Sequence, residues 1–275
     1  MLISAQQLRH AIVGEHAPAV LDVRWRLDHP DGRDAYLAGH IPGAVYVSLD
    51  DDLSDHTVAG RGRHPLPSGA AVQSAARRWG ISQGQPVVVY DDCNRAGSSR
   101  AWWVLIAAGL PDVRILDGGL TAWTAAGGEL DTGPVTTRPG DVRVGYDDLY
   151  RGALPTLTAD EVQSGAAPTL IDARSPERYR GEVEPVDALA GHIPGARNVP
   201  STSLLGDDGR FADAETVLAA ANITDSSVGV YCGSGVTASV VLAALASAGI
   251  DAALFPGSWS QWSSEAQRPV ATGPG

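Results

Sequence analysis

The residues best suited to chemistry in this chain lie in one short stretch, VYCGSGVTAS, at positions 230–239. Cys232 ends a β-branched run and is followed by Gly233 and Gly235, with hydroxyl side chains between and beyond them. Two closely spaced glycines let a backbone turn sharply and bring its N–H groups near one atom. A helix that begins near Val236 would add the positive end of its dipole. This pattern favours a thiolate, the nucleophilic form of cysteine.

Two other interpretations of the cysteine loop have to be weighed. A buried structural cysteine at a strand end would need apolar neighbours, not glycines and hydroxyl side chains. A cysteine-dependent phosphatase would need an arginine six residues after the cysteine, to bind phosphate through two hydrogen bonds. The sequence has Ala238 at that position, so phosphatase chemistry is disfavoured. The loop therefore favours a reactive cysteine of another class.

Composition and charge narrow the classes of partner. The chain has 275 residues, a formal net charge of −12 and two cysteines, Cys93 and Cys232. The negative charge argues against nucleic acid and anionic membranes as partners, and no apolar run is long enough for a transmembrane helix. Two cysteines are too few for a disulfide framework or a four-cysteine zinc site, and the N-terminus lacks the pattern of a secretory signal. We expect a cytoplasmic protein that needs no metal or organic cofactor.

The elements that must position Cys232 occur twice, because the chain contains an internal repeat. The residues AGHIPGA stand at 38–44 and again at 190–196. Three flanking segments match in the same order: VLDVRW at 20–25 with LIDARS at 170–175, VVVYDD at 87–92 with VGVYCG at 228–233, and VRILDGGLTAW at 113–123 with AALFPGSWSQW at 252–262. We therefore predict two homologous domains, 1–133 and 156–275, joined by a linker rich in Pro, Gly and Thr at 134–155.

Each half alternates short apolar runs with helical stretches. The expected strands are 19–24, 86–91, 169–173, 228–232 and 252–257, and the expected helices include 98–109 and 237–249. Apolar strands that alternate with helices are typical of an α/β domain, in which a mainly parallel sheet is flanked by helices on both faces. Ligands of such sheets bind at the carboxyl ends of the strands. Cys232 stands at such an end.

The repeated GHIPGA motif, the CGSGVTA loop in the second half only, and FPGSWSQW near the C-terminus resemble the tandem-domain rhodaneses, the thiosulfate and 3-mercaptopyruvate sulfurtransferases. The resemblance implies two rhodanese-like domains with an active site between them, and sulfur carried as a persulfide on Cys232. It also implies a small-molecule sulfur donor and a thiol or cyanide acceptor. The first domain would be non-catalytic, because Asp91 falls at the position that Cys232 occupies in the second. Cys93 is then expected to be a surface thiol.

The residues after the cysteine bear on the choice of donor. In this family, a Gly-Ser pair, here Gly233 and Ser234, is typical of enzymes that use 3-mercaptopyruvate, whereas enzymes that use thiosulfate carry basic residues there. Thiosulfate is therefore the alternative donor. The resemblance also implies that Ser234 works with His64 and Asp50 as a proton relay, with one of the two following aspartates as the alternative to Asp50. A structural loop role is the alternative for both His64 and Asp50.

The carboxylate of an α-keto acid needs a cation, and Arg178 stands where the resemblance places the first substrate-binding arginine. The second is expected where this chain has Val186, so Arg180 is the remaining candidate. The predicted substrate site is completed by four loop residues: Gly233, Gly235, Val236 and Thr237. Thr237 has a second interpretation, as the cap of the following helix.

Two rival functions remain open. A noncatalytic interaction module could be built on the same fold, although the intact cysteine loop argues against it. A sulfur relay to a protein acceptor would use the same persulfide, with cyanide as a surrogate acceptor.

Four polar residues occur at matched positions in both halves, including the half that lacks the cysteine: His40, His192, Asp22 and Asp172. They are therefore predicted to be structural.

Overall fold

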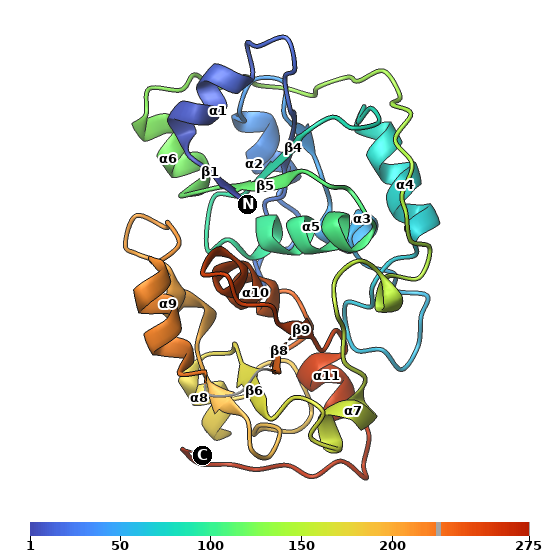
Figure 1. Cartoon of the computed structure of the whole chain (residues 1–275), viewed down its shortest axis with the longest axis vertical. Coiled ribbons are helices and arrows are strands. Elements are labelled where there is room, and N and C mark those ends of the chain that lie inside the picture. The colour runs from blue at the N-terminus through green and yellow to red at the C-terminus, as the bar shows by residue number, and fades with distance from the viewer. Residues whose placement is uncertain (224–226, 275) are drawn as a thin grey trace. The chain divides into compact units, whose positions relative to one another are not determined.

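The computed structural model describes residues 1–223 and 227–274, which form two compact units (Figure 1). Unit 1 contains Met1–Asp55, Leu66–Leu154 and Gly206–Phe211, and unit 2 contains His56–Pro65, Pro155–Leu205 and Ala212–Gly275. Each unit thus includes one short segment from the other half of the chain. The expected linker is grouped with unit 1 as far as Leu154, and the N–H of Gly140 donates to the Arg77 carbonyl at 2.8 Å. The chain-continuous domains 1–133 and 156–275 stay a prediction.

Unit 1 is a five-stranded parallel sheet in the order β1-β5-β4-β2-β3, with helices packed around it. Its strands are β1 (Leu2–Ile3), β2 (Ala19–Asp22), β3 (Val45–Tyr46), β4 (Val87–Tyr90) and β5 (Val113–Leu116). Its helices are α1 (Ala5–Ala11), α2 (Arg33–Ala38), α3 (Leu49–Asp52), α4 (Gly69–Arg78), α5 (Ala96–Ala107), α6 (Gly119–Ala125) and the 3-10 turn η1 (Leu149–Arg151). Val20, Val88 and Trp123 belong to one buried cluster with α1, while α5 packs on β4 and β5 (Figure 1).

Unit 2 is a four-stranded parallel sheet in the order β7-β6-β8-β9. Its strands are β6 (Thr169–Asp172), β7 (Arg197–Asn198), β8 (Val228–Tyr231) and β9 (Ala253–Leu254). Its helices are α7 (Ala159–Gln163), α8 (Pro176–Arg180), η2 (Ser201–Leu204), α9 (Ala214–Ala221), α10 (Ala238–Ser247) and α11 (Ser258–Trp262). Val230 of β8 pairs with Ile171 on one side and with Leu254 on the other, so β8 is a central strand. The predicted α/β class and parallel sheets are confirmed.

Four of the described strands have no counterpart among the expected ones: β1, β3, β5 and β7. Of these, β3 follows the first copy of AGHIPGA and β7 follows the second. Both are two residues long, and a pair of residues carries no measurable alternation of apolar and polar side chains. Their pairing with β2 and β6 therefore becomes visible only in the folded sheets.

The histidines of the AGHIPGA repeat have the structural role that their symmetry predicts. His40 is buried, with Nδ1 2.9 Å from the Tyr36 carbonyl oxygen and its ring stacked on the Tyr36 ring at 4.2 Å. His192 repeats the arrangement with Tyr179, at 2.8 Å and 3.8 Å. In both units the imidazole bonds a backbone carbonyl of the preceding helix and so fixes the turn against that helix, which is a structural role.

The matched aspartates at the ends of β2 and β6 are structural as well. Asp22 and Asp172 are both buried, and each pairs with the arginine two residues further on. Nη2 of Arg24 lies 2.9 Å from Asp22 Oδ2, and Nη2 of Arg174 lies 2.7 Å from Asp172 Oδ2. A buried carboxylate needs such a partner, because removal from water disfavours its charge.

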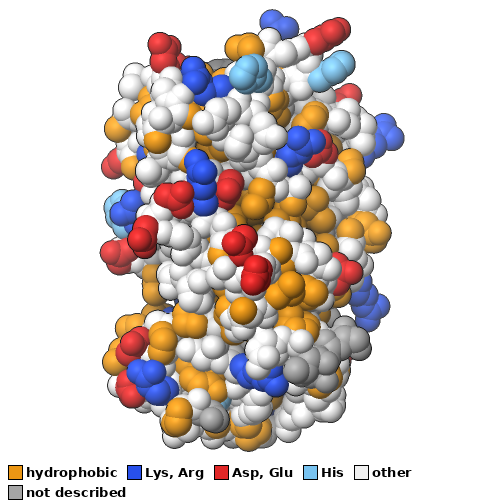
Figure 2. Space-filling view, turned by 60° about the vertical axis from the view of Figure 1, so that its left-hand side comes forward, with side chains coloured by type: hydrophobic (Ala, Val, Ile, Leu, Met, Phe, Trp, Pro, Cys, Tyr) orange, Lys and Arg blue, Asp and Glu red, His pale blue; other side chains and the backbone are white. Residues whose placement is uncertain are grey.

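The surface agrees with the sequence-level argument about charge. On the face shown in Figure 2, acidic and basic side chains of the described residues are interspersed and do not gather into a continuous basic patch. In the described part of the chain, none of the helices has the length and apolar character needed to cross a bilayer. The cytoplasmic location stays a prediction.

Candidate functional site

Cys232 directly follows β8, at the carboxyl end of the central strand of unit 2, and is 1% exposed. The N–H of Gly235 donates to its sulfur at 3.1 Å, and its own N–H donates to the Ser258 hydroxyl at 3.2 Å. The sulfur is therefore buried in a polar loop, with a backbone N–H aimed at it. A backbone N–H is a donor of the kind that a sulfur anion can accept from, and an apolar core offers none.

The loop keeps its shape through one glycine and two backbone hydrogen bonds. Gly235 has a φ of +79°, and a Cβ at this position would lie 2.7 Å from the Pro256 carbonyl oxygen. The N–H groups of Trp259 and Ser260 donate to the carbonyls of Cys232 and Gly233, both at 2.9 Å. These contacts anchor the loop to the start of α11 on one side, while α10 follows on the other.

Two predicted substrate residues lie at the start of α10. Thr237 is the N-cap residue, but its side chain makes no capping hydrogen bond, so its interpretation as a side-chain cap is wrong. Its backbone is already helical, which turns its hydroxyl away from the geometry that caps use. Val236 is 1% exposed. A substrate contact for Thr237 and for Val236 stays a prediction.

The matched loop of unit 1 holds a carboxylate where unit 2 holds a sulfur. Asp91 follows β4 as Cys232 follows β8, and it is 1% exposed. Its carboxylate accepts hydrogen bonds from the N–H groups of Cys93 and Ser98, both at 3.0 Å, and from the Ser98 hydroxyl at 2.6 Å. Arg95 Nη2 lies 2.9 Å away as a counter-ion. This loop geometry therefore cradles an anion, and Cys93 is exposed as expected.

Ser234 and His64 are brought together within unit 2. Both are buried, and the Ser234 Oγ lies 2.8 Å from His64 Nδ1. The segment that carries His64 is tied to α11, because the N–H of Arg63 donates to the Ser260 hydroxyl at 3.0 Å. The pair has the distance of a hydrogen bond and can pass a proton between oxygen and nitrogen.

Asp50 belongs to unit 1, where it is half-buried on the short helix α3. Its two neighbours are engaged within that unit. Asp51 accepts a hydrogen bond from the Ser48 hydroxyl at 2.9 Å, and Asp52 pairs with Arg78 at 2.8 Å. The role of Asp50 in a proton relay, and the alternatives Asp51 and Asp52, stay predictions.

Arg178 projects from α8 and is held by a carboxylate. Its Nε and Nη2 donate to Glu184 at 3.2 and 2.6 Å. Burial raises the pKa of Glu184, but hydrogen bonds from Arg178 and from the Asp187 N–H outweigh it, and the pKa lies below its usual value. The third nitrogen of the guanidinium, Nη1, lies 3.4 Å from the point where a Cβ on Gly233 would stand. Arg178 is thus fixed at the edge of the cysteine loop.

Arg180 is placed differently, because it lies two residues, about half a helical turn, beyond Arg178 on α8. Its guanidinium donates to Glu182 at 2.8 and 2.9 Å, and one third of its side chain is exposed. Val186, at the expected position of a second arginine, is 41% exposed. In the described structure, the recorded contacts of Arg180 do not involve the cysteine loop, and its substrate role stays a prediction.

A second cation at the loop is one that sequence reasoning missed. Arg63 pairs through Nη1 with Asp187 at 2.7 Å, and its Nη2 lies 3.4 Å from the same Cβ point on Gly233. The signal for it was modest: a basic residue directly before the candidate His64 in GRGRHPLP. Its partner is 124 residues away in the chain, so only the folded structure reveals the pair.

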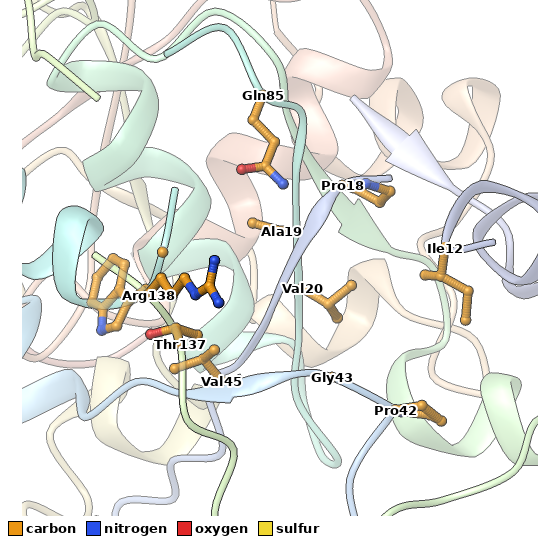
Figure 3. Close-up of a pocket in the computed structure, with 12 residues that line it drawn as sticks. Ile12, Pro18, Ala19, Val20, Pro42, Gly43, Val45, Gln85, Thr137 and Arg138 are labelled. Carbon is orange, nitrogen blue, oxygen red and sulfur yellow. The ribbon is translucent and has the colours of Figure 1, made fainter. Parts of the chain in front are cut away.

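A pocket of about 430 Å³ opens elsewhere in unit 1 (Figure 3). Ala19 and Val20 line it from the first half of β2, and Gln85 lines it from just before β4. It therefore lies at the amino ends of these strands, whereas Asp91 follows the carboxyl end of β4. Ligands of parallel sheets bind at carboxyl ends, so this pocket does not lie at the edge of the unit 1 sheet where a ligand is expected.

Comparison with known proteins identifies the family. A rhodanese-like domain is matched at residues 4–126 and again at 155–265. The chain is 61% identical over 277 residues to "Putative thiosulfate sulfurtransferase SseB" of Mycobacterium tuberculosis, covering 99% of this chain and 97% of that protein. It is 45% identical over 282 residues to "Probable 3-mercaptopyruvate sulfurtransferase" of Pseudomonas aeruginosa, covering 99% and 98%.

Solved structures agree as well. The crystal structure of SseA from Escherichia coli, described as a 3-mercaptopyruvate sulfotransferase, matches with a TM-score of 0.81 at 32% identity, covering 94% of this chain and 98% of that one. The 3-mercaptopyruvate sulfurtransferase from Leishmania major matches with a TM-score of 0.84 at 29% identity, covering 98% and 76%. The chain belongs to the rhodanese family. Within it, the chain is a sulfurtransferase with two rhodanese domains, as predicted.

Proposed function

We propose that this enzyme moves a sulfane sulfur from 3-mercaptopyruvate, through a persulfide on Cys232, to a thiol or cyanide acceptor. The observation that carries the proposal is the N–H of Gly235 donating to the Cys232 sulfur at 3.1 Å. The same loop in unit 1 holds the carboxylate of Asp91 with two N–H groups. A cradle built for an anion suits a thiolate before the reaction and a persulfide anion after it.

The transfer takes place in two balanced half-reactions. First, the Cys232 thiolate attacks the donor sulfur, so that an S–S bond forms as the donor's C–S bond breaks. The electron pair leaves on carbon as the pyruvate enolate, which takes up a proton to become pyruvate. Then the acceptor attacks the outer sulfur, the S–S bond breaks and Cys232 leaves as a thiolate. The acceptor becomes a persulfide or thiocyanate.

The first half-reaction also has to move a proton. The donor thiol brings one, and the enolate carbon needs one. Ser234 stands two residues after the nucleophile, and its hydroxyl lies 2.8 Å from His64 Nδ1. This pair is suited to take the proton from sulfur and return it to carbon, with Asp50 proposed as the group that orients the imidazole.

Two arguments favour 3-mercaptopyruvate as the donor. A relay of this kind is useful when the leaving group is an enolate, whereas sulfite leaves from thiosulfate without a proton. The relatives from P. aeruginosa and E. coli, at 45% and 36% identity, are named 3-mercaptopyruvate sulfurtransferases. Thiosulfate is the second candidate, because the M. tuberculosis relative at 61% identity is named for it.

Intact mass tests the persulfide directly. The reduced Cys93→Ser protein is incubated with each donor, separated from it and weighed. We expect a gain of one sulfur atom, and no gain when Cys232→Ser is added. A noncatalytic module would gain sulfur from neither donor. Steady-state kinetics then choose between the donors, and a kcat/KM for thiosulfate about tenfold above that for 3-mercaptopyruvate would reverse our choice. Transfer to protein thiols but not to small thiols would identify a sulfur relay.

A further inference from the structure

We propose that Arg63, held in place by Asp187, is the second cation that binds the carboxylate of the sulfur donor, beside Arg178. The inference rests on the proposed function, since it concerns the anionic group of the same substrate. It assigns to the segment 56–65 a cation that the resemblance to the family led us to expect at position 186, where the chain has Val186.

The two guanidinium groups meet next to the residue that follows the nucleophile. A point at the Cβ position of Gly233 lies 3.4 Å from Arg63 Nη2 and 3.4 Å from Arg178 Nη1. Arg178 Nη2 lies 3.5 Å from the same point. Three donors from two segments thus surround one small space that Gly233 leaves without a side chain. A carboxylate, which accepts charge-assisted hydrogen bonds from more than one donor, fits such an arrangement.

Both arginines are fixed without being closed off from solvent. The side chain of Arg63 is 29% exposed and that of Arg178 is 15% exposed. Arg63 uses Nη1 on Asp187, and its buried Nε has no hydrogen-bond partner among the described residues. It therefore retains donors for a ligand. Arg180 donates two hydrogen bonds to Glu182 and forms an ion pair with Glu177, so its guanidinium pairs with carboxylates on or next to its own helix.

The charge balance of the cluster suits a monoanion. Asp187 lies 2.7 Å from Arg63 Nη1 and 3.6 Å from Arg178 Nη2, and Glu184 pairs with Arg178 at 2.6 Å. Arg174 also pairs with Glu184 at 3.3 Å and with Asp172 at 2.7 Å, so three cations face three carboxylates and leave little net charge before the donor binds. A single carboxylate can then be held by oriented hydrogen bonds. A dianion depends more on net positive charge, and it is attracted less strongly here than it would be by two arginines without carboxylate partners.

Alkylation of Cys232 tests the inference without any sulfur transfer. Iodoacetate and iodoacetamide both form an Sγ–C bond and release iodide, and they differ in a carboxylate against a neutral amide. In a Cys93→Ser background, we expect Arg63→Ala to lower the rate constant for iodoacetate about tenfold and to leave that for iodoacetamide unchanged. Arg63→Lys should restore part of the rate. Arg197→Ala is the matched control, because Arg197 is exposed in the same unit and donates to the Asn222 carbonyl.

Kinetics with 3-mercaptopyruvate supply the second readout. Arg63→Ala should raise KM about tenfold or more while kcat changes less than about threefold. An unchanged KM and an unchanged iodoacetate rate would overturn the inference, as would an equal loss with both alkylating reagents, which indicates a structural role. If Arg180→Ala produced these effects instead, Arg180 would be the second cation. If the wild-type chain failed to acquire sulfur, the proposed function would be wrong. The alkylation result would still test anion binding by Arg63, because alkylation does not require sulfur transfer.

Discussion

The hydroxyl oxygen of Ser234 lies 2.8 Å from Nδ1 of His64, and both side chains are buried. The two residues are 170 positions apart in the chain. Ser234 belongs to the loop that carries Cys232 and stands two residues after it, so the contact places a titratable ring against this loop. A hydrogen-bonded pair of this kind is suited to the proton transfer that we propose for the first half-reaction.

The Ser234–His64 pair should matter for one donor more than for the other. We expect His64→Ala and Ser234→Ala each to lower kcat with 3-mercaptopyruvate about a hundredfold, because the enolate needs a proton. Turnover with thiosulfate should change less than about threefold, because sulfite leaves without one. Ser247→Ala is the control, since its hydroxyl donates to the Ala244 carbonyl of its own helix at 2.7 Å. Equal losses with both donors would contradict a proton-transfer role.

Gly235 and Gly249 have the same backbone conformation, so substitutions at the two positions distinguish the cost of backbone strain from the cost of a steric contact. Their φ values are +79° and +81°, but a Cβ on Gly235 would lie 2.7 Å from the Pro256 carbonyl oxygen, whereas one on Gly249 would meet no atom of the described residues within 4 Å. We expect Gly249→Ala to cost about 1 kcal/mol of unfolding free energy. Gly235→Ala should cost more, and it should also lower kcat/KM about a hundredfold by displacing the Gly235 N–H from the sulfur. Urea unfolding and steady-state kinetics measure both. Equal effects of the two substitutions would show that the contact with Pro256 is unimportant.

Neutralising Asp187 should shift the preference between donors. In Asp187→Asn the cluster loses one of its three carboxylates, so the local charge becomes more positive. A dianion gains more from this than a monoanion. We expect KM for thiosulfate to fall about threefold or more relative to KM for 3-mercaptopyruvate. Asp160→Asn is the control, because Asp160 pairs with Arg268 on the surface of the same unit. A parallel change in both KM values would argue against a role of Asp187 in charge balance.

Asp22 should make the stability of the chain depend on pH. Burial raises the pKa of Asp22 to about 6, while Arg24 and the hydrogen bond from Tyr90 act in the opposite direction. Since the usual value is 3.8, the folded protein binds this proton more tightly than the unfolded chain does. Its stabilising contribution is therefore present at low pH and is lost as the pH rises through about 6.

The matched variant for this test is Asp22→Asn, which cannot titrate. Lowering the pH from about 7 to about 5 should stabilise the wild-type chain by about 1 kcal/mol relative to Asp22→Asn. Urea unfolding of both proteins at several pH values gives the difference. A difference that is independent of pH, or that falls as the pH is lowered, would show that Asp22 stays ionised in the folded state.

Much of this protein could be predicted from local patterns in its sequence. The two copies of AGHIPGA identify the duplication, and the apolar runs that end in Asp22 and Asp172 identify matched parallel strands. The position of Cys232 at the end of β8 also follows from its own neighbours. These features can be predicted because a strand, a glycine turn and a helix start each have a sequence pattern that spans about ten residues or fewer.

Other features were decided by tertiary structure alone. The grouping of 56–65 with unit 2 and the pairing of Arg63 with Asp187 join segments that lie far apart in the chain. The same is true of the approach of two guanidinium groups to Gly233. The sequence does not show whether a charged side chain is solvated or paired. Its partner depends on which distant segments the folded backbone brings together. Folding determines which charges meet, and in this chain it placed a second arginine at the loop from a segment where the repeat pattern had no reason to put one.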